Sequence, residues 1–60
     1  MTELVVLNYA TSEVDFYSFD MDITSDTIED FLFVKKKYRE SEISWMVADN
    51  LFINNYGNNY

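Results

Sequence analysis

The fold is decided by two short runs near the start of the chain, LVVLNY at positions 4–9 and VDFYSF at positions 14–19. Both runs are short and rich in aliphatic, β-branched or aromatic residues, a composition typical of strands. The four residues between them, ATSE at positions 10–13, are polar and turn-like. Because so short a connection joins antiparallel neighbours most easily, the pattern predicts a β-hairpin.

A helix is predicted after this hairpin, from about residue 27 to about residue 37. Asp26 suits an N-cap, and Glu29 three residues later completes a pattern like a capping box. Four apolar residues recur at helical spacing and form one stripe: Ile28, Phe31, Leu32 and Val34. Phe33 falls on the opposite, polar side of this helix.

A second hairpin is predicted from the remaining residues. ISWMV at positions 43–47 alternates as a strand, ADN at 48–50 reads as a tight turn, and residues 51–56 resume an extended pattern. A rival interpretation continues the helix through residues 42–47, but the β-branched and aromatic content favours a strand. The sum is a single α+β domain over residues 1–60, a ββαββ fold in which one helix packs on one face of a small antiparallel sheet. Residues 57–60 are expected to form a frayed end.

The stretch YRESEISWMV at positions 38–47, followed by Asp49 and Asn50, resembles a segment of small uncharacterised proteins of gut-dwelling Gram-negative anaerobic bacteria and their mobile elements. Those proteins also open with a short β-hairpin and an acidic helix start, so the similarity covers most of the chain. In that family the position of Lys37 is often glycine, and this chain departs from the pattern there. The resemblance implies a bacterial or phage origin and a cytoplasmic location, and it implies no known activity.

Composition removes most catalytic and metal-binding chemistry. The chain has no cysteine and no histidine, so thiolate nucleophiles and the commonest general base and metal ligand are missing. Oxygen-bearing residues alternate over positions 20–26 as in a calcium loop, but Ser25 stands where that loop needs glycine and Phe31 where it needs glutamate. We therefore expect no cofactor, no metal and no enzymatic activity. No run approaches the roughly 20 apolar residues of a membrane span, and we expect a cytoplasmic protein.

Charge is distributed unevenly along this acidic chain, whose net charge is −7. Every basic residue lies within five positions: Lys35, Lys36, Lys37 and Arg39. Acidic residues at a helix start and basic ones at its end complement the helix dipole, which explains part of the pattern. A net negative charge repels nucleic acid, so direct binding of DNA or RNA is not expected. The same field would attract a basic protein surface, so an acidic inhibitor that mimics nucleic acid is the alternative function.

Apolar residues on both faces of the expected sheet favour self-association. A two-layer domain usually shows apolar residues toward its helix and polar residues toward water. Here one face would carry Val5, Leu7, Phe16, Ile43, Trp45, Val47 and Ile53, and the other Leu4, Val6, Tyr17, Phe19, Met46 and Phe52. Which face the helix covers stays open, and either choice leaves an apolar surface of the kind that marks interaction sites.

We therefore predict a small protein-interaction module, most simply a homodimer, that binds itself or another protein. The predicted interaction residues combine the apolar set with the basic cluster: Tyr17, Phe19, Phe33, Lys35, Lys36, Lys37, Arg39, Met46 and Phe52. A possible mode pairs the basic cluster of one copy with the acidic hairpin of another.

Overall fold

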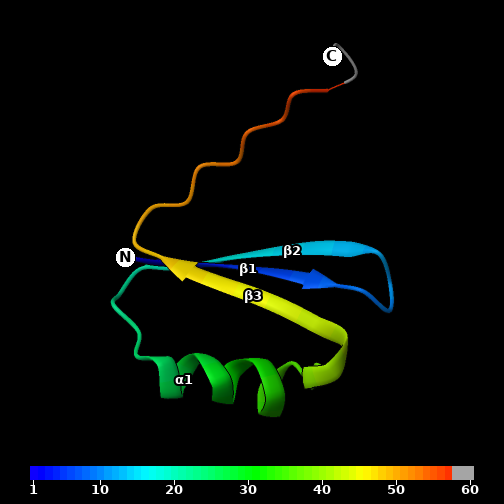
Figure 1. Cartoon of the computed structure of the whole chain (residues 1–60). Helices are drawn as coiled ribbons and strands as arrows, with labels where there is room; N and C mark the ends of the chain where they lie inside the picture. Colours follow the sequence, from blue (N-terminus) through cyan, green and yellow to red (C-terminus); the bar gives the residue numbers. More distant parts are fainter. Residues whose placement is uncertain (58–60) are drawn as a thin grey trace.

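Three antiparallel strands form one sheet in the computed structural model, which describes residues 1–57 (Figure 1). Strand β1 spans Thr2–Asn8, β2 spans Glu13–Phe19 and β3 spans Ile43–Ala48. Their order is β2-β1-β3, so β1 lies in the centre and both later strands are edges. The first hairpin is confirmed, and residues 43–48 form a strand rather than a continuation of the helix. Of the expected frayed end, residues 58–60 lie outside the described residues.

The helical segment begins earlier than the sequence predicts. Helix α1 spans Ser25–Asp30 and continues as a π-helical turn over Phe31–Lys35. The N-cap is Thr24 and not Asp26, because the Thr24 side chain accepts a hydrogen bond from the Thr27 backbone N–H at 3.4 Å. Asp26 instead lies in the first turn, where its negative charge still complements the helix dipole.

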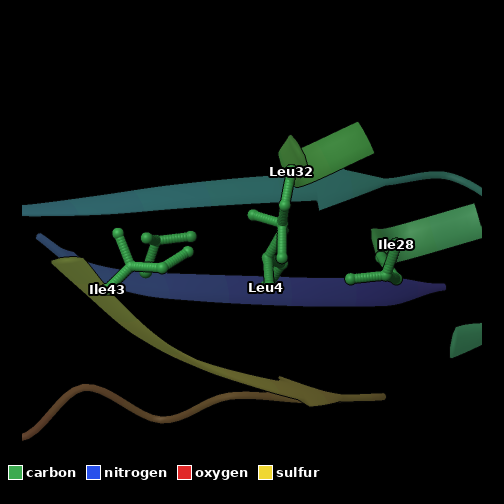
Figure 2. Packing of buried hydrophobic residues seen from close by; sticks show 5 residues of the cluster. Leu4, Ile28, Leu32 and Ile43 are labelled. Carbon is green, nitrogen blue, oxygen red and sulfur yellow. The ribbon is translucent and has the colours of Figure 1, made fainter. Parts of the chain in front are cut away.

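The core lies between α1 and one face of the sheet (Figure 2). Its members are fully or almost fully buried apolar side chains: Leu4, Val6, Ile28, Leu32 and Ile43. Rings from both layers are partly buried against this cluster, including Tyr17, Phe19, Phe31, Phe33 and Trp45. One helix therefore covers one face of the sheet, as the α+β prediction expects.

The strand register identifies the face that the helix covers. Leu4 lies opposite Tyr17 on β2 and opposite Val47 on β3, so these residues share the covered face. The sequence-based sets placed Leu4 and Val47 on opposite faces and were wrong there. The partition failed because each strand's alternation is local, whereas the register between β1 and β3 joins residues that are 35 to 45 positions apart in the sequence.

Residues 51–56 were expected as a fourth strand, but within the described chain they are extended and unpaired. Figure 1 shows this segment leaving the sheet on the side opposite α1. The turn expected over residues 48–50 does not form, because Ala48 is the last residue of β3 and pairs with Glu3 of β1. Tyr9 N–H donates to the Glu42 carbonyl at 2.8 Å, one step beyond the end of the β1–β3 register. Hydrogen-bonded pairs alternate along an antiparallel ladder, so Glu3 and Ala48 are also such a pair.

With Ala48 in β3, Asp49 and Asn50 are the two residues left for a turn, and the ladder phase does not suit a two-residue turn. Such a turn requires the Ala48 carbonyl to point toward Leu51, on the outer edge of the sheet. In this ladder the backbone groups of Ala48 point inward to β1 instead. The Leu51 N–H donates to the Glu3 carboxylate at 2.8 Å, which holds the start of the 51–56 segment away from the β3 edge.

Candidate interaction surface

The face of the sheet away from α1 is apolar and uncovered. Its side chains come from all three strands: Val5 and Leu7 on β1, Val14 and Phe16 on β2, and Met46 on β3. The register places Val5 between Phe16 and Met46, and Leu7 beside Val14, so the five side chains are adjacent. We call these five residues the open face. Four of them are exposed: Leu7 43%, Val14 65%, Phe16 44% and Met46 55%.

A shallow hollow lies on the β3 side of the open face. It is lined by Val5, Leu7, Ser44, Trp45 and Met46 and encloses about 280 Å³. Sites for small molecules usually measure about 300–1,000 Å³ and bury most of their ligand. A hollow of this size and composition is suited to receive an apolar side chain from another polypeptide.

The predicted interaction residues do not form one surface. Met46 lies on the open face, whereas Tyr17 and Phe19 lie on the covered face and pack against the core. Phe33 is also partly buried against the core, although its position in the helical pattern suggested exposure. Phe52 is 85% exposed, on the unpaired segment beyond β3.

Sequence reasoning did not identify Val5, Leu7, Val14 and Phe16 as interaction residues. The sequence held a weak signal that this face is the one turned away from the helix, because polar residues usually face water. Each edge strand places one small polar residue on it: Ser18 on β2 and Ser44 on β3. That signal could not be used without the strand register.

All four members of the basic cluster are exposed, and one of them, Lys36, also contacts aromatic rings of its own chain. The Phe31 ring meets the rings of Tyr17 and Phe19 edge-on, at centroid distances of 5.0 and 5.2 Å. The Lys36 Nζ atom lies over this group, 5.4 Å from the Tyr17 centroid and 5.8 Å from that of Phe31. Lys36 thus makes cation–π contacts within its own chain. The other three exposed members are Lys35, Lys37 and Arg39.

Tyr38 links the end of the helical segment to β2. Its hydroxyl donates to Asp15 Oδ2 at 2.6 Å and lies 2.6 Å from the Tyr17 hydroxyl. Burial raises the pKa of Tyr38 above its usual value, and the hydrogen bonds to Asp15 and Tyr17 raise it further. These two hydrogen bonds hold the neutral Tyr38 phenol between the helical segment and β2, so we assign Tyr38 a structural role.

The rest of the described surface offers little chemistry. A second groove of about 220 Å³ lies beside α1, and the residues that line it are Phe19, Ile23, Thr27, Ile28, Asp30, Phe31 and Lys35. Among residues 1–57 no three side chains are grouped so that they could hold a metal ion. None of the described helices is long and apolar enough to cross a membrane.

Comparisons with known proteins leave the geometry as the guide to function. The chain matches no protein-family model, no curated protein and no solved structure.

Proposed function

We propose that this chain is a small non-enzymatic interaction module that self-associates through its open face, most simply as a two-fold dimer. The observation that carries the proposal is the set of five adjacent apolar side chains, drawn from three strands, that nothing in the described chain covers. A monomer whose apolar sheet face lies in water lacks the favourable free energy that comes from burying that face. A second copy supplies a matching apolar face, because a two-fold axis brings the same surface patch together.

Charge does not oppose contact at this face. Of the strand residues that share it, Glu3 alone is charged, and its carboxylate accepts the hydrogen bond from Leu51. The other two strand carboxylates, Glu13 and Asp15 of β2, lie on the covered side. Two open faces can therefore meet without opposing like charges, although the two whole molecules repel each other at long range.

A lysine substitution at Met46, the residue that β3 contributes to the open face, tests the proposal. Met46→Lys places a charge in the proposed interface, and each dimer contains the change twice. Losing the burial of one methionine side chain costs about 1.5 kcal/mol or more, so two copies weaken dimerisation by about 100-fold or more in Kd. Sedimentation velocity or light scattering over a concentration series measures the change.

Val34→Lys is the matched control, because Val34 is an apolar residue of similar exposure, 62% against 55%, on the helical layer. We expect Val34→Lys to dimerise like the unmodified chain. Equal weakening by both substitutions would place the interface elsewhere. An unmodified chain that stays monomeric at micromolar and higher concentrations would overturn the proposal.

The second candidate function is an acidic inhibitor that occupies a nucleic-acid-binding cleft of another protein. This function is favoured because few of the carboxylates are paired with a cation. Within residues 1–57 the one ion pair joins the Met1 amine to Asp22 at 3.0 Å. Uncompensated carboxylates attract basic surfaces. This function predicts that the purified chain displaces DNA or RNA from a basic binding protein, and that rising salt abolishes the displacement. We also propose a bacterial or phage origin and a cytoplasmic location for this chain.

A further inference from the structure

We propose that residues 51–56 of one copy add as a fourth strand to the β3 edge of a second copy, reciprocally, within the dimer. The inference rests on the proposed self-association and names the segment that completes it. It assigns a partner to two features that the described chain leaves open, an extended segment without pairing and an edge strand without protection.

The β3 edge presents unpaired backbone groups at known residues. Because Ser44 and Met46 are hydrogen-bonded to β1 in the ladder phase set by the Tyr9–Glu42 bond, the residues between them point the other way. The N–H and carbonyl groups of Ile43, Trp45 and Val47 therefore face outward, where an added strand would bind them.

The two edges of the sheet differ in the residues that discourage pairing with another chain. Natural edge strands carry charged side chains, prolines or bulges that discourage pairing with another chain. Strand β2, with the sequence EVDFYSF, has two carboxylates, whereas β3, with the sequence ISWMVA, has no charge and no proline. This contrast selects the β3 edge as the acceptor.

The 51–56 segment has the properties of the donor strand. It is six residues long, the same length as β3, and has no charged residue in a chain of net charge −7. Its apolar side chains extend into solvent, with Phe52 85%, Ile53 72% and Tyr56 79% exposed. Bringing it against another copy adds apolar contact and no charge repulsion.

The acceptor also has a place for a side chain of the added strand. The hollow lined by Val5, Leu7, Ser44, Trp45 and Met46 adjoins the β3 edge on the open face. Side chains alternate along a strand, so either Phe52 or Ile53 would point toward that hollow. In the same chain the segment does not fill the hollow: Phe52 and Ile53 are exposed, and the Leu51 N–H is bonded to the Glu3 carboxylate.

The test is amide hydrogen exchange of the unmodified chain at two concentrations, below and above its dimer Kd. We expect the amides of Ile43, Trp45 and Val47 to slow with concentration, by about fivefold at a total chain concentration of ten times the Kd, where about one fifth of the chains are still monomeric. Ser44 and Met46 are internal controls on the same strand, because their amides are bonded to β1 in either state. Phe52→Asp should weaken the dimer, and Asn54→Asp, which adds the same charge without removing an apolar group, should weaken it less.

A paramagnetic label distinguishes the possible failures. The chain has no natural cysteine, so a spin label attached through Asn54→Cys on one copy reports on an isotope-labelled second copy at one defined site. Broadening of β3 amides in the second copy supports the inference. A dimer whose β3 amides are neither broadened nor protected would overturn strand addition and leave the open-face dimer standing. A chain that is monomeric throughout would overturn both proposals.

Discussion

Replacing Lys37 with glycine should stabilise the fold, because Lys37 has the backbone conformation that favours glycine. Its φ is +59°, in the left-handed region, and its side chain is exposed. This conformation reverses the chain at the end of the helical segment. There Lys36 N–H donates to the Phe31 carbonyl at 2.9 Å, and Tyr38 N–H donates to the Leu32 carbonyl at 3.0 Å. The reversal also brings the Tyr38 hydroxyl to Asp15.

The size of the effect follows from two opposing terms. A left-handed conformation costs an L-residue about 1–2 kcal/mol, and glycine does not incur this cost. Glycine loses more conformational freedom on folding, which costs about 0.5–1 kcal/mol. The net gain for Lys37→Gly is about 0.5–1 kcal/mol, or about 2–8 °C in Tm for a domain of this size. No packing contact opposes the gain, since the lysine side chain lies in solvent.

Thermal and urea unfolding followed by circular dichroism measure this gain. The samples should be compared at one low concentration, because association raises apparent stability. Lys37→Ala is the control: it removes the same charge and side chain but keeps the cost of the left-handed conformation. The reasoning is refuted if Lys37→Gly is no more stable than the unmodified chain, or if Lys37→Ala gains as much.

Three further outcomes are expected. Leu32→Ala should destabilise the chain by about 3–5 kcal/mol, since Leu32 is fully buried; a 60-residue domain holds about 3–9 kcal/mol in total, so urea unfolding should show most of it unfolded. Tyr38→Phe should cost about 1 kcal/mol by removing its hydrogen bonds. Because the folded state keeps the Tyr38 proton that the unfolded chain releases above pH 10.0, stability should fall as the pH rises past that value, and less steeply in Tyr38→Phe. Added salt should tighten the dimer by screening the repulsion of two copies of charge −7; loosening would indicate contact between the basic cluster and the acidic hairpin.

Local patterns in the sequence predicted the elements but not their partners. The runs at 4–9 and 14–19 were sufficient for a hairpin, because four connecting residues leave one convenient pairing. The apolar stripe that includes Ile28 and Leu32 was sufficient for a helix, and both residues are in the core. The helix start was displaced by two residues because Thr24 competes as a cap with Asp26, and local sequence does not decide between them.

The sequence predicted that an apolar face of the sheet would stay uncovered, but it did not identify the residues that form this face. Alternation showed that one apolar face would stay uncovered, which the structure bears out. Identifying that face required knowing that Leu4 lies opposite Val47, a pairing of residues that are distant in sequence. Tyr17 and Phe19 were assigned to the uncovered surface because alternation placed them in the apolar set expected to face away from the helix, but the Phe31 ring meets both of them beside the core.

The 51–56 segment shows why a strand-like pattern can be sound while its expected pairing fails. A β-propensity reports that a segment fits a pleated, half-buried surface, and it does not say which surface. Within the described chain the ladder phase at Ala48 turns the nearest backbone groups toward β1, and the Glu3 carboxylate takes the Leu51 N–H. What remains is a segment suited to a sheet, beside an uncharged sheet edge with which it forms no turn and no pairing in its own chain. A second copy supplies the same edge without that turn, so the element that failed as a local hairpin is the one best suited to join two chains.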